Sequence, residues 1–416
     1  MAYPLKCVSE ELGRLEKKSL ALAPANKYLE DLIQNYSSNF PAKEAKTVHK
    51  PHGEGLHVLL TGSTGYLGYY LLKTLIADSN VAKILCFNRG WTEPRNNSIE
   101  ESGGLDGAAK VQFVKVSFGE PRFGLTPAVH QSFLDTVDVI IHNAWPVDFN
   151  LSIKSFEKIH IAGIRNFIDW SILSPRKVTI QFVSSVGSFG NWSSFRPKTP
   201  VSEEVFTDGD LPTLGYGQSK FVAENILNNA AKQRGISIDI LRCGQLSGPV
   251  GDGKKKWNTR DWFPILMQTS KALGLIPSNL GAQNLVQWIP IDSVSQIIIE
   301  LMQGSGTREG STTFNLINPA SAYWTDLLPT VKDVLEVTKE VSLKDWLKEL
   351  KKHDDKSREE LEKFPALKLL NFFEWVASEE QLVITTDNAK AASASFRELS
   401  PISKEMVGGW VKDWGF

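Results

Sequence analysis

The sequence predicts an α/β fold: a doubly wound parallel sheet with a smaller, mainly helical C-terminal subdomain. Apolar runs of strand length recur from residue 57 onward, and helical spacing separates most of them. Strands that are apolar at every position are buried on both faces, which is typical of a parallel sheet covered by helices. The expected strands are 57–60, 83–87, 111–116, 137–142, 179–184 and 238–242.

The chain divides into three predicted parts. Residues 1–55 hold two helix-like pieces and a polar connector with Pro and Lys, and we expect them to be a leader or linker outside the core. Residues 56–250 are expected to form the sheet domain, to which apolar runs near 285–295 and 312–318 return as further strands. Residues 251–416 are expected to form a substrate-side subdomain.

The composition of the chain argues against several classes of binding partner. The 416 residues include 46 basic and 47 acidic side chains, a net charge of -1, whereas nucleic acids and anionic membranes attract a basic surface. No apolar stretch approaches the roughly 18 residues of a membrane span. The three cysteines, Cys7, Cys86 and Cys243, are too few and scattered for a disulfide framework or a zinc site, and the seven histidines form no ligand motif. We expect no nucleic-acid, membrane or metal partner, and a reducing, cytoplasmic setting.

A glycine-rich turn follows the first predicted strand directly. The segment Thr-Gly-Ser-Thr-Gly-Tyr-Leu-Gly at 61–68 lies between that strand and a helical stretch. Glycines there allow a tight turn and a close approach of the backbone to a pyrophosphate, whose charge faces the free N–H groups of the helix N-terminus. The motif predicts an extended Rossmann domain that binds a dinucleotide through Gly62, Ser63, Thr64, Gly65, Tyr66, Leu67 and Gly68.

The end of the second predicted strand favours one cofactor. NAD enzymes usually place an acid about 20 residues beyond the turn, where it holds the ribose hydroxyls. This chain has Asn88 and Arg89 at that place. A guanidinium can grip a 2′-phosphate that a carboxylate would repel, so NADPH is expected, with Arg95 as a second phosphate contact. A solvated surface arginine is the alternative interpretation of Arg89.

Three side chains form the predicted catalytic group. Tyr216 and Lys220 are four residues apart in a helical stretch and therefore share a helix face. The lysine charge is expected to lower the phenol pKa and make Tyr216 a general acid. Upstream, Val-Ser-Ser at 183–185 ends a strand and enters a Ser- and Gly-rich loop, which puts the Ser185 hydroxyl where it can donate to a carbonyl oxygen.

Together these segments resemble the extended short-chain dehydrogenase/reductase superfamily. They are more closely similar to the thioester reductase domains of nonribosomal-peptide-synthetase-like enzymes, carboxylic acid reductases and aminoadipate reductases, in their fungal form. The resemblance covers about 56–416. Its further motifs are Cys-Phe-Asn-Arg-Gly at 86–90, His-Asn-Ala-Trp-Pro-Val at 142–147, Leu-Arg-Cys-Gly-Gln at 241–245 and Trp-Ile-Pro-Ile-Asp at 288–292.

The resemblance assigns roles to several residues. It implies that Ser185 polarises the substrate carbonyl, that Tyr216 donates the proton, and that Lys220 supports Tyr216 and the nicotinamide ribose. The further implied cofactor contacts are Ser117, Asn143, Ala144, Trp145, Ser184 and Gly244. Many family members carry an acid near the adenine where this chain has Val-Ser-Phe at 116–118, so the adenine contact departs from the family's pattern.

The function implied by the resemblance is NADPH-dependent reductive release. A carrier-bound acyl thioester on a phosphopantetheine arm is reduced to an aldehyde, and a second hydride gives the alcohol. The partner would be a carrier (thiolation) domain, and the chain would be monomeric or part of a larger multidomain protein. Two alternatives stay open: a reductase or epimerase acting on a free carbonyl or sugar, and a non-catalytic NADP-binding module. The C-terminal half favours the thioester, and Ser185, Tyr216 and Lys220 favour an enzyme.

Overall fold

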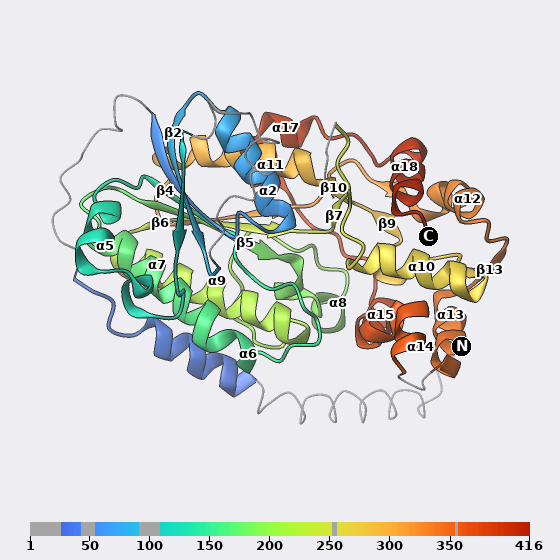
Figure 1. The fold of residues 1–416 in the computed structure, drawn as a ribbon. Helices are drawn as coiled ribbons and strands as arrows, with labels where there is room; N and C mark the ends of the chain where they lie inside the picture. The colour runs from blue at the N-terminus through green and yellow to red at the C-terminus, as the bar shows by residue number, and fades with distance from the viewer. Residues whose placement is uncertain (1–25, 43–54, 91–108, 252–255, 354–356) are drawn as a thin grey trace.

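A computed structural model describes residues 26–42, 55–90, 109–251, 256–353 and 357–416 (Figure 1). Seven strands form one sheet, in which every neighbouring pair is parallel. From edge to edge they are β11 (Ser311–Leu316), β6 (Ser237–Cys243), β5 (Thr179–Ser185), β4 (Val139–His142), β1 (Leu56–Thr61), β2 (Val81–Asn88) and β3 (Val111–Lys115). The predicted parallel α/β sheet is confirmed.

Helices cover both faces of this sheet. One face carries α2 (Tyr66–Ala77) and α11 (Ile291–Gln303), and the other carries α7 (Ala162–Leu173) and α9 (Leu214–Arg234) (Figure 1). Each face has its own buried core, mainly aliphatic under the first pair of helices and rich in Phe and Trp under the second. Because both faces are buried, the strands are apolar along their whole length.

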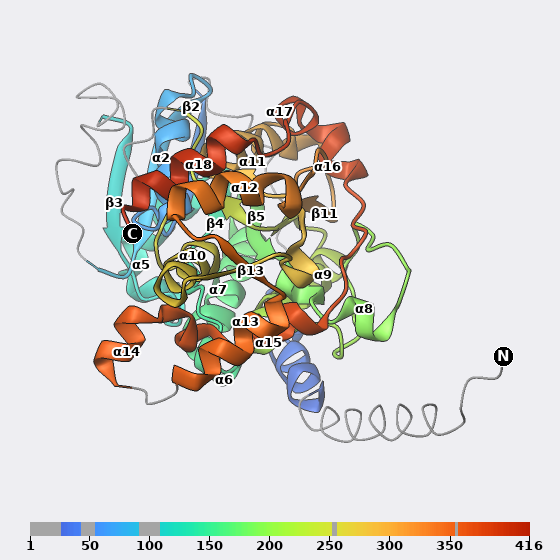
Figure 2. The same cartoon turned by 90° about the vertical axis from the view of Figure 1, so that its right-hand side faces the viewer.

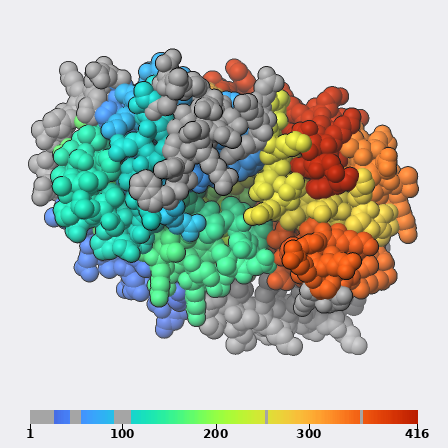
Figure 3. All heavy atoms as spheres, viewed as in Figure 1, coloured from blue at the N-terminus to red at the C-terminus, as the bar shows by residue number. Residues whose placement is uncertain are grey.

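The C-terminal subdomain lies beside one end of the sheet, and Figure 2 turns it toward the viewer. Figure 3 shows its orange and red segments meeting the blue and green sheet domain. Trp257, Trp288, Trp324 and Trp346 are buried in its core. Its helices are α10 (Trp262–Leu273), α12 (Trp324–Leu335), α13 (Leu343–Leu350), α14 (Arg358–Lys363), α15 (Leu370–Ser378) and α18 (Lys404–Trp414). The predicted helical character of this subdomain is confirmed.

One of the two predicted returns to the sheet is wrong. The run at 312–318 does return, as β11 beside β6. The run at 285–295 instead forms β9 (Leu285–Val286) and β10 (Ile289–Pro290), which pair outside the main sheet with β12 (Ala322–Tyr323) and β7 (Leu246–Ser247). Pro290 has no N–H for a longer ladder, and α11 begins at the next residue. The remaining short elements are α5 (Pro127–Leu134), α6 (Lys154–Phe156), α8 (Trp192–Phe195), α16 (Asp387–Ala392), α17 (Ala394–Arg397), β8 (Leu275–Pro277) and β13 (Lys339–Val341).

Part of the N-terminal segment belongs to the core, contrary to the prediction of a leader outside it. Residues 26–37 form a helix below α7 and α9, and Leu29, Leu32 and Phe40 are buried in the core of that face (Figure 1). The Arg165 guanidinium on α7 donates to carbonyl oxygens at 36–39. The polar composition of the segment hides this packing, which depends on a few apolar side chains on one helix face. Residues 1–25 and 43–54 lie outside the described part of the chain.

Replacing Leu32 with alanine is expected to lower the free energy of unfolding by about 2–5 kcal/mol, because the change leaves a cavity under the N-terminal helix. The exposed neighbour Asp31 is the control, and Asp31→Ala should change that free energy by less than about 0.5 kcal/mol. Chemical denaturation followed by circular dichroism measures both. Equal, small effects would show that this helix is not part of the cooperative folding unit.

Candidate active site

The strand order reverses at β1, whose neighbours are β2 and β4. In doubly wound sheets, ligands bind at this point, beyond the carboxyl ends of the strands. The glycine turn follows β1 and Asn143 follows β4, so both lie here. A cavity of about 1240 Å³ extends from these residues to the C-terminal subdomain, where α10 and α15 contribute to its wall.

Two glycines shape the turn. Gly62 has φ +71°, in the left-handed region, and a Cβ at Gly68 would lie 1.9 Å from the Gly62 carbonyl oxygen. Only glycine permits this contact between α2 and the end of β1. No side chain caps α2, whose N-cap is Gly65, so the amides of its first turn are available to an anionic ligand. The turn therefore fits the pyrophosphate of a dinucleotide.

A threonine hydroxyl holds the ends of β1 and β4 together. Thr61 Oγ1 accepts the amide hydrogens of Asn143 and Ala144 at 3.0 and 2.9 Å. Because both amides donate, the hydroxyl hydrogen of Thr61 is left for His142 Nδ1, 2.9 Å away. Burial holds the pKa of His142 well below its usual range, so this ring is neutral. The sequence prediction omits Thr61, although its position as the last residue before the turn was an available signal.

Most of the predicted cofactor contacts line the cavity. They are Gly62, Thr64, Gly65, Tyr66, Leu67, Arg89, Asn143, Ala144, Trp145, Ser184 and Gly244. Among the described residues, the other three predicted contacts do not line it. Gly68 supports the turn from behind, and the Ser63 hydroxyl accepts a hydrogen bond from the buried Asn88 amide at 2.9 Å. Ser117 is exposed, and the neighbouring Phe118 lines the cavity in its place. Arg95 lies outside the described residues.

Arg89 lies directly after β2, where it lines the cavity while its side chain stays exposed. Its charge reaches His160 on the same cavity wall. Burial lowers the pKa of His160 to about 4, and the positive charges of Arg89 and Lys220 add to this effect. The guanidinium is thus accessible to a ligand in the cavity. It also lies near enough to His160 for its charge to lower the pKa of that ring.

The three predicted catalytic side chains lie together on the cavity wall. Ser185 ends β5, Tyr216 lies in the first turn of α9, and Lys220 follows one turn later. The side chains of Ser185 and Tyr216 are hydrogen-bonded to each other. Lys220 Nζ lies 5.8 Å from the centroid of the Tyr216 ring and donates to the Val183 carbonyl oxygen at 2.6 Å. This lysine therefore links the helix to the strand that ends at Ser185.

Close backbone packing brings Tyr216 to Ser185. A Cβ at Gly217 would lie 2.2 Å from the Gly187 carbonyl oxygen, so the start of α9 contacts the backbone of the serine loop directly. Leu214, the first residue of α9, has φ +53°, a conformation that costs a residue with a side chain about 1–3 kcal/mol. The glycines in both motifs thus allow the approach that the two hydroxyl groups need.

The pKa of Tyr216 is shifted upward, whereas the sequence predicted that the lysine charge would lower it. Burial raises the pKa of the Tyr216 phenol above its usual range, and the hydrogen bond with Ser185 opposes this only in part. Burial also lowers the pKa of Lys220 to about 7, against the opposing effects of Cys243 and Glu224. Desolvation is the cause in both cases, and residue spacing carries no information about it. At neutral pH, the phenol is therefore a protonated hydrogen-bond donor.

Cys86 and Cys243 are buried thiols, and burial raises the pKa of each to about 12, so neither is a reactive thiolate. Cys7 lies outside the described residues. Within the ranges that the structure describes, no three His, Cys, Asp or Glu side chains lie close enough to hold a metal ion. The described helices include none with the length and apolar character needed to span a bilayer.

Residues 60–298, more than half of the chain, match the male sterility protein family of NAD-binding domains. The chain belongs to this family. A carboxylic acid reductase of Neurospora crassa is 32% identical to this chain over 404 residues. The match covers 93% of this chain and 38% of that protein. An adenylate-forming reductase of Serpula lacrymans is 33% identical over 93% of the chain and 37% of that protein. The chain thus spans about two fifths of the length of these relatives.

Several solved structures share the fold of this chain. The terminal R domain of the myxalamid PKS-NRPS pathway has a TM-score of 0.76 at 23% identity and covers 93% of this chain and 97% of that one. The reductase (R) domain of a nonribosomal peptide synthetase from Mycobacterium tuberculosis has a TM-score of 0.67 at 18% identity, with coverage of 92% and 95%. The extended Rossmann fold and the resemblance to thioester reductase domains are confirmed. The family to which the chain belongs is one of NAD-binding domains, which supports a nicotinamide cofactor at the glycine turn.

Replacing Gly68 with alanine is expected to weaken cofactor binding at least tenfold, or about 1.4 kcal/mol, because the new Cβ would overlap the Gly62 carbonyl oxygen and displace the turn. Gly409→Ala on α18 is the control, since nothing lies within 4 Å of its added Cβ and alanine favours a helix. Fluorescence titration measures cofactor affinity. If the two variants bind the cofactor equally well, the turn is not its binding site.

Proposed function

We propose that the chain is an NADPH-dependent thioester reductase that releases a carrier-bound acyl group as an aldehyde. The observation that carries this proposal is the position of Ser185, Tyr216 and Lys220 on the wall of one cavity that extends from the glycine turn to the C-terminal subdomain. A cofactor on the turn and an acyl group entering from the subdomain would meet at these side chains. The cavity, about 1240 Å³, exceeds the range of about 300–1,000 Å³ usual for small-ligand pockets, which suits a long pantetheine arm.

The chain's own groups supply the polar part of the reaction. The nicotinamide, when bound, supplies a hydride for the carbonyl carbon. Ser185 donates a hydrogen bond to the carbonyl oxygen, and Tyr216, whose pKa is raised by burial, keeps its proton until that oxygen becomes basic. The ammonium of Lys220 then faces the phenolate that remains. Hydride and proton together give a hemithioacetal, whose C–S bond breaks to release an aldehyde and a thiol.

The cavity wall beyond Tyr216 is aromatic. Phe149 lies edge-on to Tyr216, with ring centroids 5.7 Å apart, and stacks on Phe372 at 4.8 Å. Phe372 in turn contacts Trp262 and Trp375, each at 5.9 Å. Such a surface binds apolar groups, and aromatic ones best of all. The acyl group that this wall fits is therefore apolar, and an aryl ring next to the carbonyl would pack on Phe149.

One solved structure with this fold suggests how a substrate could be delivered. A thiolation-reductase di-domain from an archaeal nonribosomal peptide synthetase matches 93% of this chain and 79% of its own length, with a TM-score of 0.64. We infer that a carrier domain presents the acyl thioester to this chain, either within one polypeptide or as a separate partner.

Product analysis with an aryl acyl-pantetheine thioester and NADPH tests the proposed function, with free aldehyde and thiol as the expected products. Tyr216→Phe should lower kcat by about 10²–10⁴ because the proton donor is lost, while the Kd of NADPH changes little. Tyr323→Phe, at an exposed site, is the matched control. Alcohol among the products would show a second reduction. Turnover of free aldehydes, ketones or sugars without any thioester reduction would overturn the assignment.

Arg89→Ala should weaken NADPH binding at least tenfold, or about 1.4 kcal/mol, and leave NADH binding nearly unchanged, because the contact that is lost is to the 2′-phosphate. Arg260, another exposed arginine of the cavity wall, provides the control: Arg260→Ala should leave the ratio of the two affinities as it is. Titration of each protein with both cofactors gives these ratios. Equal weakening of NADPH and NADH by Arg89→Ala contradicts the assignment.

A further inference from the structure

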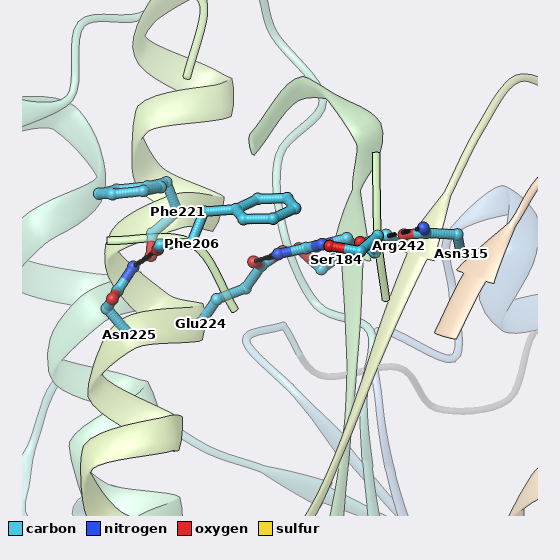
Figure 4. Close-up of polar contacts among 8 residues, drawn as sticks. Ser184, Phe206, Phe221, Glu224, Asn225, Arg242 and Asn315 are labelled. Atoms are coloured by element: carbon cyan, nitrogen blue, oxygen red, sulfur yellow. Dashed lines mark hydrogen bonds and ion pairs between the residues drawn. The ribbon is translucent and has the colours of Figure 1, made fainter. Parts of the chain in front are cut away.

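A buried ion pair lies directly behind the proposed catalytic group. Glu224 is one helical turn beyond Lys220 on α9, and Arg242 reaches it from β6; both side chains of the pair are 1% exposed. Arg242 Nη2 lies 2.7 Å from Glu224 Oε2, and Arg242 Nε lies 3.1 Å from each carboxylate oxygen. The Ser184 hydroxyl donates to Glu224 Oε1 at 2.5 Å. Figure 4 shows the three side chains in a line between α9 and the sheet.

The strand register brings these side chains together. Ser184 on β5 and Arg242 on β6 are register partners, and Asn315 on β11 is the partner of Arg242 on its other side (Figure 4). The hydroxyl of Ser184, a residue predicted to contact the cofactor, is therefore used within this network. Because the next residue is Ser185, the contact with Glu224 also fixes the backbone that carries the Ser185 hydroxyl.

Charged and titratable groups from several elements surround Lys220. They are Tyr216 and Glu224 on α9, Cys243 on β6, His142 at the end of β4, and His160 in the segment before α7. Burial holds the pKa of His142 well below its usual range and that of His160 at about 4, and it raises the pKa values of Tyr216 and Cys243. These four groups are thus neutral near pH 7. Among these described neighbours, the negative charge comes from Glu224.

We propose that Glu224, held by Arg242, is a positioning residue for the reduction: it fixes α9 against the strand that ends at Ser185, and its charge maintains the ammonium of Lys220. This inference rests on the proposed function of Ser185, Tyr216 and Lys220. Burial favours the neutral amine of Lys220 and lowers its pKa to about 7, and the negative charge of Glu224 opposes this effect. If the charge of Glu224 were removed, this pKa would fall, and Lys220 would lose its proton at a lower pH.

The test compares Glu224→Gln with Asp239→Asn. Asp239 is the matched control because, like Glu224, it is 1% exposed and pairs with an arginine at 2.7 Å, here Arg308; it lies on β6, the strand of Arg242. Asp239 is three residues nearer the start of β6 than Arg242 and does not line the cavity. Both changes remove a buried carboxylate from its arginine, which is fully buried for Arg242 and 20% exposed for Arg308, and both should lower Tm. Only Glu224→Gln should shift the alkaline limb of kcat/KM to lower pH, by about one unit, with a parallel shift in the pH dependence of NADPH binding.

A second variant separates the effect of the Glu224 charge from the effect of its side-chain length. Glu224→Asp keeps the carboxylate but is too short to contact Ser184 and Arg242 together, so the alkaline limb should stay in place while kcat falls about tenfold or more. If Glu224→Gln fails to fold, Glu224→Asp tests the role of the charge. A shift of its alkaline limb of kcat/KM to lower pH would overturn the inference. An unshifted limb in folded Glu224→Gln overturns it as well. Absence of thioester turnover in the wild type contradicts the proposed function instead, and the pH dependence of NADPH binding still decides the role of Glu224.

Discussion

The common direction of the seven strands is the constraint on which the site depends. Parallel strands end at the same edge of a sheet, so residues far apart in the chain gather there. Gly62, Asn143, Ser185 and Gly244 each end or follow a different strand, and all four line the cavity. Helix α9 adds its polar side chains to this edge because Gly217 lets its backbone contact the serine loop. A one-residue slip of a single strand would separate the groups.

Features that depend on neighbours along the chain could be predicted from the sequence. The apolar strands, the glycine turn at 61–68 and the spacing of Tyr216 and Lys220 are local, and the structure contains each of them. Features that depend on partners elsewhere in the fold could not. The run at 285–295 has the composition of a strand, yet Pro290 and the start of α11 keep it out of the sheet. Likewise, the packing of the N-terminal helix depends on α7 and α9, against which its apolar side chains are buried.

Electrostatic properties were the hardest to predict, because they depend on burial by the whole fold. Spacing correctly suggests that Tyr216 and Lys220 are neighbours, but the direction of the phenol pKa shift follows from desolvation. The hydroxyl of Thr61 and the carboxylate of Glu224 were missed for a related reason. The partner amides of Thr61 follow the end of β4, and the partners of Glu224 lie on β5 and β6, so both sets of contacts depend on how the elements align in the fold. The sequence shows which residues are present, but it does not show which residues of neighbouring elements lie opposite one another.

A fully buried ion pair requires an explanation, because two apolar side chains would fill the same space without the cost of desolvating two charges. The pair of Asp239 and Arg308 keeps its arginine partly exposed, at 20%, and connects β6 with the end of α11. The pair of Glu224 and Arg242 has no such access to solvent. Apolar replacements could hold α9 against β6, but they would leave the amine of Lys220 among neutral groups, where burial favours its uncharged form. A charged pair at this place is therefore consistent with a need for charge at Lys220 rather than for stability alone.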